Sequence, residues 1–418
     1  MGLFQRFKAD QKGATAMIFG GAMLPLMTMV GAAVDYSNLI LERSNLQHAA
    51  DLAALAIVKL PLTASQSEIQ QVATAAVQGM FGAKVGIPTA KGVRLEAPTV
   101  TRSDKTVKVE ATASVDMLLM NVLGHGPKQI GARSSALWSS RRIELALVLD
   151  NTGSMNDSIG GDTKLAALKT SAKQLLEGLR KSAKEADTTK VSIVPFATTV
   201  KLDPATYRSQ PWFRWSGSST SAASWGGLVK ERYNAYQFSS AAPSATINDS
   251  LYTPESGSAA KLAKIQPLVS LYTTADYDKL VRSVDAMQGE GTTNVSLGAM
   301  WGLATLTPGA PFAGPAAFDK NVEKFMVVLT DGDNTQGSYN GATVTSVSRL
   351  DTATGAACSA VKTAGVKVYT IRLKAGNEAL LRACASSPGM YFNVQDATGL
   401  SDAFKAITDS ILGTRITS

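Results

Sequence analysis

The sequence predicts an α/β protein: a doubly wound, mostly parallel sheet preceded by a transmembrane helix and a small α+β stalk region. Three observations support this prediction. An uncharged apolar run lies near the N-terminus, short segments of alternating apolar and polar residues follow it, and strand-like apolar runs then alternate with amphipathic helical segments. The expected parts are a cytoplasmic N-terminus (1–12), a transmembrane helix (13–34), a helical extension (35–60), the stalk region (61–142) and the α/β domain (143–418).

The composition is that of a folded protein of two or three units. The chain has 418 residues, of which 45% are hydrophobic and 18% charged, so it can bury at least one substantial core. Its formal net charge is +8, but the Lys and Arg residues are scattered, so we expect no nucleic-acid binding. His48 and His125 each stand apart from any Cys, Ser or Asp constellation, which argues against a histidine-based active site.

The apolar run Gly13–Val34 carries no charged residue and has about the length, roughly 20 residues, that a helix needs to cross a bilayer. Arg6, Lys8 and Lys12 precede it with only Asp10 against them. By the positive-inside rule the first residues stay in the cytoplasm and the rest is exported. We therefore expect a single-pass protein of the cytoplasmic (inner) membrane whose C-terminal domain is periplasmic or extracellular. The alternatives are a cleavable signal peptide, whose apolar region is usually shorter, and a buried core helix.

After the span, apolar positions recur at helical spacing up to Leu60, so the helix is expected to continue beyond the membrane. Gly13 and Ala14, together with "LQHAADLAALA" at Leu46–Ala56, resemble the N-terminal region of TadG-like proteins of the tight-adherence (Tad) pilus system. This resemblance implies a role in assembly or secretion of Flp pili, with pilus assembly components as partners. The related small pilins carry a Glu five residues after their Gly cleavage point, where this chain has Ile18, so we expect the anchor to remain uncleaved.

The stalk region is expected to contain a small antiparallel sheet. "VRLEAPTV" (93–100) and "KTVKVEATASV" (105–115) alternate apolar and polar residues around the turn-forming "TRSDK", which predicts a hairpin. A short apolar stretch, "MLLMNVLG" (117–124), precedes a third expected strand within 130–140. Nothing in this region indicates chemistry, so we expect a structural role.

The α/β domain opens on "RRIELALVLD", a nearly continuous apolar run that ends at Asp150 and is typical of a strand buried on both faces of a parallel sheet. An amphipathic helix at 162–186 and a strand at 190–200 follow. Further strands are expected within 324–334, 367–373 and 391–397, alternating with helices at 351–365, 377–387 and 400–412.

Candidate ligands lie at the ends of the expected strands. Asp150 and Asp331 each follow directly on an apolar strand, and the loop Gly289–Gly298 has the Gly and Thr content of a ligand loop that leads into a helix. In a doubly wound sheet, binding sites lie beyond the carboxyl ends of the strands, where the strand order reverses. We expect these three loops to converge on one point.

These loops offer only oxygen ligands: two aspartate carboxylates and the hydroxyls of Thr152, Ser154 and Thr293. Such ligands suit a hard cation, so we expect Mg²⁺ or another divalent cation at this site. The alternate spacing from Asp150 to Ser154 lets one turn direct three oxygens at one ion, and we expect Gly153 to allow a tight backbone path. The alternative is that these polar residues cap helices.

The pattern resembles the metal-ion-dependent adhesion site (MIDAS) of von Willebrand factor type A domains, which has Asp-x-Ser-x-Ser, a distant Thr, and an Asp in "TDG". Asp150, Thr152 and Ser154 match the first piece, with Thr in place of the first Ser, Thr293 matches the distant Thr, and Asp331 lies in "LTDG". The resemblance implies a Rossmann-like type A domain with a role in adhesion, in which the cation captures an acidic side chain of a partner protein.

Enzyme motifs are missing from the sequence. An aspartyl-nucleophile phosphatase would need a second Asp where this chain has Thr152, and neither a Gly-x-Ser-x-Gly elbow nor a P-loop occurs. We therefore expect a binding protein and no enzyme. Two alternatives stay open: a general surface adhesin or envelope-sensing protein outside a pilus system, and, less favoured, a metal-dependent hydrolase.

A long insertion, at about 201–273, follows the second strand of the α/β domain. A connection of this length is either functional or a subdomain of its own. We expect a small lobe with an aromatic core; the alternative is that the insertion flanks the metal site and takes part in partner recognition. Its aromatic residues include Trp212, Phe213, Trp215, Trp225, Tyr233 and Tyr236.

The chain has two cysteines, Cys358 and Cys384, too few for a structural zinc site. They fall in the helices expected before and after the strand at 367–373. Neighbouring helices on one face of a sheet can bring two cysteines together, and an exported domain permits oxidation, so we expect a disulfide. Free buried thiols are the alternative.

Overall fold

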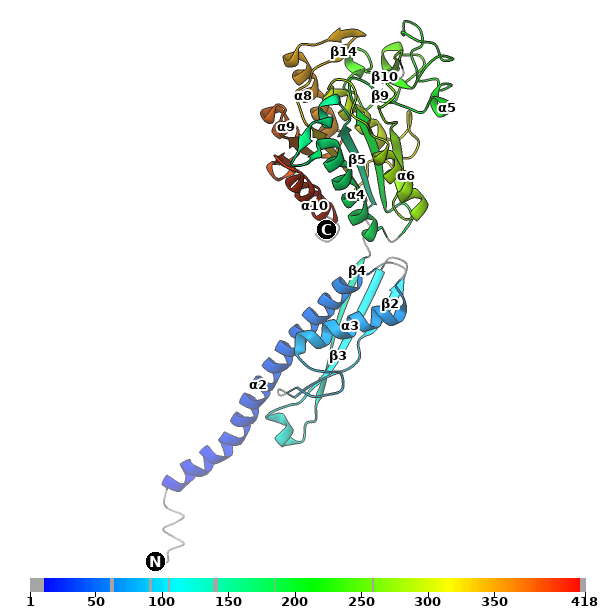
Figure 1. Ribbon diagram of the computed structural model, residues 1–418. Helices are drawn as coiled ribbons and strands as arrows, with labels where there is room; N and C mark the ends of the chain where they lie inside the picture. The colour runs from blue at the N-terminus through cyan, green and yellow to red at the C-terminus, as the bar shows by residue number, and fades with distance from the viewer. Residues whose placement is uncertain are drawn as a thin grey trace, which may run out of the picture. The chain divides into compact units, whose positions relative to one another are not determined.

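The chain divides into two compact units, Met1–Ser139 and Ser140–Ser418 (Figure 1). The first contains the N-terminal helix and a small antiparallel sheet, and the second contains the large α/β domain. The computed structural model describes residues 11–60, 64–89, 92–103, 106–137, 142–183, 185–257 and 259–413.

The N-terminal helix α2 (Gln11–Ile57) is one continuous element of 47 residues. The expected span and its helical extension therefore belong to a single helix, which continues through Pro25 as membrane helices tolerate. Within the part of the chain that the structure describes, α2 is the one helix long and apolar enough to cross a bilayer. Its N-terminal half exposes large apolar side chains, among them Leu26 and Met29, as a lipid-facing helix would.

The C-terminal half of α2 packs into the core of the first unit, where Leu46 and Ile57 are fully buried. Beside it lies α3 (Gln66–Phe81), which begins with a capping box: Ser65 and Glu68 each accept a hydrogen bond from the backbone N–H of the other. The alternating patterns of the stalk sequence do not predict this helix. The capping box is the local signal that does.

The antiparallel sheet of the first unit centres on β3 (Thr106–Val115), which pairs with β4 (Lys128–Leu137) along its whole length. On the other edge of β3, two short strands replace the single strand expected at 93–100: β1 (Val93–Leu95) and β2 (Thr99–Ser103). Pro98 lies between them. Because proline has no backbone N–H, it interrupts the ladder at that point. The expected hairpin forms between β2 and β3.

The second unit contains a six-stranded sheet in the order β12-β8-β5-β13-β16-β17. All neighbouring strands are parallel except the edge pair β12 and β8. The predicted mostly parallel, doubly wound sheet is therefore confirmed. The strands are β5 (Arg142–Asp150), β8 (Thr189–Phe196), β12 (Gln266–Ser270), β13 (Val322–Thr330), β16 (Lys367–Leu373) and β17 (Tyr391–Val394).

Helices cover both faces of this sheet. Alternate residues of β5 divide between the two resulting cores: Leu145 and Leu147 face one, and Ala146 and Val148 face the other. The first core is closed by α4 (Lys164–Ser182), α6 (Thr274–Asp285) and α10 (Ala397–Gly413), and the second by α7 (Val295–Leu306) and α8 (Val347–Thr363).

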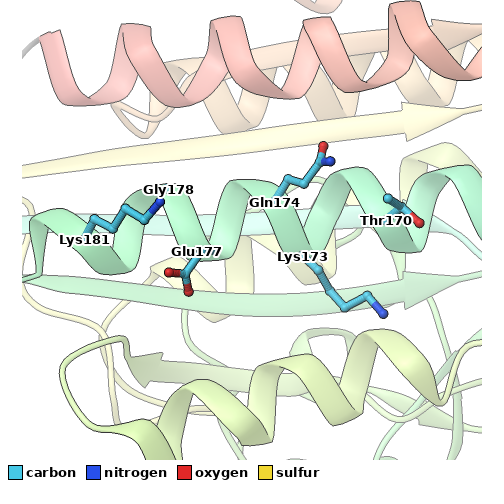
Figure 2. Close-up of a pocket in the computed structure, with 6 residues that line it drawn as sticks. All are labelled: Thr170, Lys173, Gln174, Glu177, Gly178 and Lys181. Carbon is cyan, nitrogen blue, oxygen red and sulfur yellow. The ribbon is translucent and has the colours of Figure 1, made fainter.

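Figure 2 shows α4 with α6 and α10 on either side and a shallow pocket on its surface. The helix α4 begins near the carboxyl ends of the strands and runs from there across the face of the sheet. The pocket therefore lies along the helix, outside the loops at the strand ends. It is lined by Thr170, Lys173, Gln174, Glu177, Gly178 and Lys181.

On the opposite face, α7 packs closely against the sheet at two glycines that face the strands. A Cβ on Gly298 would come within 2.7 Å of the Phe196 ring, and one on Gly302 within 2.5 Å of Val148. Any larger residue would push α7 outward. The close approach places the N-terminus of α7, and the loop before it, at the edge of the sheet.

The long insertion forms a lobe whose aromatic side chains pack together. Trp212, Phe213 and Trp225 are buried, and Tyr252 carries the aromatic contacts on to Trp301 of α7. The lobe thus shares one core with a face of the main sheet. Its regular elements are β9 (Val200–Lys201), α5 (Pro204–Tyr207), β10 (Leu228–Lys230) and β11 (Thr253–Pro254).

The two cysteines form a disulfide between α8 and α9 (Glu378–Cys384), with a Cα–Cα distance of 5.2 Å between Cys358 and Cys384. Short hairpins and single turns complete the second unit. They are β6 (Ser158–Ile159), β7 (Asp162–Thr163), β14 (Gly337–Tyr339), β15 (Ala342–Val344) and the 3-10 turns Gly153–Asn156, Asn234–Tyr236, Asn248–Ser250 and Pro388–Met390.

Candidate metal centre

Asp150 is the last residue of β5, and Asp331 directly follows β13, the neighbouring parallel strand. Leu149 of β5 pairs with Leu329 of β13, so the residues that follow emerge side by side. From β5 the sheet continues through β8 on one side and through β13 on the other, so the strand order reverses here. The two aspartates therefore lie at the position where doubly wound sheets bind ligands.

The carboxylate of Asp150 is completely buried and held from three directions. Its Oδ1 accepts hydrogen bonds from the backbone N and the hydroxyl of Thr152, at 2.9 and 2.5 Å. Its Oδ2 accepts one from the hydroxyl of Thr330, at 2.8 Å. These bonds fix the orientation of the carboxylate before any ligand binds.

Asp331 is also buried, and its two oxygens have different partners. The hydroxyl of Ser154 donates to Oδ1 at 2.6 Å, and the ammonium of Lys164 donates to Oδ2 at 2.8 Å. Lys164 is the first residue of α4, is itself buried, and reaches Asp157 at 3.3 Å on its other side. Strand ends and a helix start thus meet at one carboxylate.

The hydroxyls of Thr152 and Ser154 lie 3.0 Å apart, yet each has only one hydrogen. When both carboxylates are ionised, those hydrogens point to Asp150 and Asp331, and none remains between the two hydroxyl oxygens. Their lone pairs then face each other without a proton. A cation bound by both oxygens would remove this repulsion, so the donor set fits a hard metal ion.

The pKa shifts around Asp150 and Asp331 indicate that this site has too little positive charge. Burial and the nearby charge of Asp331 raise the pKa of Asp150 to about 6, against the lowering effect of hydrogen bonds from Thr152 and Thr330. Burial alone would lower the pKa of Lys164, but its hydrogen bonds and ion pairs with Asp331 and Asp157 outweigh burial and raise it. Within the described part of the chain, the ammonium of Lys164 is the one cation bonded to either of these two buried carboxylates.

Thr293 lies in a loop that is bonded to both other loops of the site. The backbone N of Gly153 donates to the carbonyl of Gly291 at 3.1 Å, and the backbone N of Thr335 donates to the carbonyl of Thr293 at 2.9 Å. Thr293 is buried, and its own N–H donates to the hydroxyl of Thr335 at 2.8 Å. Among the described residues, no hydrogen bond joins its hydroxyl to the two aspartates.

Glu231, from the aromatic lobe, supports the Thr293 loop. Its buried carboxylate accepts a hydrogen bond from the side-chain amide of Asn294, at 2.5 Å, and bonds from the backbone N and hydroxyl of Ser338. Asn334 accepts a hydrogen bond from the N of Val295 at 2.9 Å. The lobe and the loop after β13 together hold the start of α7.

The sequence patterns missed Lys164, Thr330 and Glu231, because each contributes through a tertiary contact. One expectation about the backbone is wrong. Gly153 does not have a positive φ, and a Cβ there would lie 3.5 Å from the carbonyl of Gly291, an ordinary contact. The local path from Asp150 to Ser154 therefore does not require glycine. Among the described residues, no group of three or more His, Cys, Asp or Glu side chains forms a metal site, so this centre depends on hydroxyls.

Family models match two parts of the chain. Residues 13–56 match the Tad family, Flp pilus-assembly TadE/G-like. Residues 258–406 match the von Willebrand factor type A domain. The chain joins a TadE/G-like region to a type A domain. The match to the type A domain includes Thr293 and Asp331, while Asp150, Thr152 and Ser154 precede it in the same compact unit.

Solved structures similar to this chain include pilus proteins. The pilus adhesin SpaC from Lactobacillus rhamnosus GG is 12% identical, with a TM-score of 0.41, over 77% of this chain and 35% of that chain. The vWF domain of the type V pili tip protein Mfa5 from Porphyromonas gingivalis is 12% identical, with a TM-score of 0.41, over 65% of this chain and 96% of that chain.

Proximal thread matrix protein 1 from the mussel byssus, with a zinc-occupied MIDAS motif, is 16% identical, with a TM-score of 0.37, over 65% of this chain and 46% of that chain. This chain thus covers about a third of the length of SpaC and about half of the length of the byssus protein. No curated protein matches it.

Proposed function

We propose that this protein is a membrane-anchored, extracytoplasmic component of Flp/Tad pilus assembly or secretion, and that its type A domain binds protein partners through a divalent cation. The TadE/G-like region and the type A domain support the association with pili. The long apolar helix α2 supports a single-pass anchor in the cytoplasmic membrane. The basic residues before the span favour a periplasmic or extracellular type A domain.

The observation that carries the metal proposal is the continuous chain of oxygens from Asp150 through Thr152 and Ser154 to Asp331. These four residues and Thr293 would hold Mg²⁺ or another divalent cation. When bound, the cation supplies an electrophilic point of attachment for an acidic side chain of a partner. The surrounding residues orient these ligand oxygens, exclude water from the two aspartates and hold the three ligand loops at the edge of the sheet.

Calorimetric titration of the purified full chain with Mg²⁺ tests the metal site. We expect binding by the wild type and binding weaker by roughly tenfold or more in Asp331→Asn, since a buried carboxylate loses its charge. Asp333→Asn is the matched control, because Asp333 is exposed in the same loop. Equal affinity in Asp331→Asn and wild type, or no binding by the wild type, would overturn the proposal.

Affinity capture from envelope extracts, with and without chelator, tests partner binding. We expect pilus assembly components to be retained by the wild type with Mg²⁺ and lost with chelator or in Asp331→Asn. Recovery of the same proteins in all samples would contradict a metal-dependent mechanism. A hydrolytic activity that disappears in Asp150→Ala, without any capture of partners, would favour the hydrolase alternative. Metal-dependent capture of surface molecules unrelated to pili would favour the general adhesin.

A further inference from the structure

The loop between β3 and β4 exposes an unusual group of apolar side chains. Leu118 is 62% exposed, Leu119 48% and Val122 84%. They belong to the stretch Met117–Gly124, which includes the 3-10 turn Met120–Leu123. A cluster of large, exposed apolar side chains marks a surface that contacts a membrane or another protein.

A buried acid on α2 holds this loop in place. The carboxylate of Asp35, only 2% exposed, accepts hydrogen bonds from three consecutive backbone N–H groups, those of Leu118 at 3.0 Å, Leu119 at 3.0 Å and Met120 at 2.7 Å. Charge-assisted bonds of this kind are strong. They also satisfy the carboxylate without water, so an acid directly after the apolar span can be kept beside a membrane.

The same loop touches α2 one turn earlier, inside the apolar run. A Cβ on Gly31 would lie 3.1 Å from the Cβ of Leu119, so glycine lets the loop approach the helix axis closely. The exposed side chains of Val30 and Val34 lie on this part of the helix. The apolar surface of the loop is therefore at the level of the last turn of the expected span.

The rest of the small sheet extends away from this level. Farther along α2, the side chain of Gln47 donates to the carbonyl of Arg133 in β4, and Asp35 and Gln47 are separated by about 18 Å of helix. The loop at Met117–Gly124 is thus the end of the sheet nearest the apolar half of α2. Tyr36, which is 65% exposed beside Asp35, is the type of residue enriched at membrane interfaces.

We propose that the loop Met117–Gly124 inserts the side chains of Leu118, Leu119 and Val122 into the bilayer leaflet from which α2 emerges, so that the small sheet contacts the membrane at a second place. The inference rests on the proposed membrane anchor. Lipid is the expected occupant because the patch continues the apolar surface of α2 at the same level. A second contact would restrain the tilt of the helix and thereby the direction in which the stalk leaves the membrane.

Single-cysteine fluorescence in nanodiscs tests this proposal. Val122→Cys in the full chain is labelled with nitrobenzoxadiazole, and the nanodiscs contain phosphatidylethanolamine and phosphatidylglycerol with or without doxyl-labelled lipid. The native cysteines are joined in the disulfide and do not take the label. Met27→Cys reports on the span. Ser103→Cys lies on β2, where Ser103 pairs with Thr106 at the start of β3, roughly 30 Å from the end of β3 that leads into the loop, and it reports on the far end of the sheet.

We expect the label at Val122 to emit at shorter wavelength than the label at Ser103 and to be quenched by doxyl lipid, as the label at Met27 is. Quenching at Met27 without quenching at Val122 would overturn the loop proposal and leave the anchor intact. A blue shift at Val122 without lipid quenching would show a protein contact and would also overturn it. Absence of quenching at Met27 would overturn the anchor itself.

Discussion

At the scale of single residues, the charge of the candidate metal centre depends on Lys164. Its ammonium donates to Asp331 at 2.8 Å from a buried position. Among the described residues, the donors to the second carboxylate, that of Asp150, are two hydroxyls and one backbone N–H. An internal ammonium and a divalent cation would compete for the same carboxylate. We therefore expect Lys164 to stabilise the domain without a cation and to oppose cation binding at the proposed site.

Lys164→Met is expected to shift stability and metal affinity in opposite directions. Without the ammonium, the two aspartates repel each other in the metal-free state, so the melting temperature without Mg²⁺ falls, because a buried ion pair has lost one partner. The affinity for Mg²⁺ rises by roughly tenfold, about 1.4 kcal/mol, because the competitor is gone. Thermal unfolding and calorimetric titration measure the two effects.

Lys169→Met is the control for that substitution. Lys169 lies on the same helix but bonds a backbone carbonyl, that of Asp285, at the exposed surface. It should leave the affinity for Mg²⁺ unchanged. A Lys164→Met variant that binds Mg²⁺ more weakly than the wild type would mean that the ammonium assists the site and does not compete with the ion.

At the scale of secondary-structure elements, the position of α7 decides where Thr293 lies. The helix is buried on nearly all sides, and its close packing rests on Gly298 and Gly302 against β5, β8 and β13. Because Asn294 caps α7, a displacement of the helix moves the Thr293 loop with it. Packing against the sheet and geometry of the site are thus coupled through one element.

Gly298→Ala is expected to lower both the stability of the domain and its affinity for Mg²⁺. The added Cβ would lie 2.7 Å from the stiff ring of Phe196, so the domain should lose about 1–3 kcal/mol of stability. The affinity for Mg²⁺ should fall because the Thr293 loop shifts. Chemical denaturation and metal titration test this.

Gly355→Ala in α8 is the matched helical control. Its Cβ would meet only the end of the Leu380 side chain, at 3.9 Å. This substitution should be neutral or stabilising by up to about 1 kcal/mol, since alanine has the higher helix propensity. If both variants behave alike, steric contact with the sheet does not control the position of α7.

At the scale of the whole molecule, the two compact units have separate cores. The first is built from α2, α3 and the four-stranded sheet, and the second from the helices and strands of the type A domain together with the aromatic lobe. The candidate metal ligands all belong to the second unit. A ligand that binds only one folded unit stabilises that unit alone.

Mg²⁺ is therefore expected to raise the unfolding temperature of the second unit only. At a free concentration of 100 times the dissociation constant, the stabilisation should be about 2.7 kcal/mol. Tryptophan fluorescence follows this unit through Trp212, Trp225 and Trp301, which are buried in it. At the same Mg²⁺ concentration the stabilisation of Asp331→Asn should be about 1.4 kcal/mol or less, because its affinity is at least tenfold lower. A shift of the full wild-type size in that variant would place the ion elsewhere.

Much of this architecture could be predicted from the sequence because its signals are local. The uncharged run before Asp35, the apolar strand that ends at Asp150, and the positions of Cys358 and Cys384 in flanking helices are readable from spacing and residue type. Where local signals were ambiguous, prediction failed. The strand at 93–100 is divided at Pro98, and the helix α3 lies in a region whose alternating segments predict strands, so that its capping box is the one local helix signal there.

The sequence by itself determined which residues end strands, which segment is apolar enough to cross a membrane, and which side chains offer oxygen ligands. Only the tertiary structure decided which of these meet. Ser154 and Lys164 reach Asp331 across 177 and 167 residues of chain, because β5 and β13 become neighbours where the strand order reverses. Likewise, Asp35 binds a loop 83 to 85 residues away. Such contacts depend on strand order and helix packing, which the spacing of nearby residues does not encode.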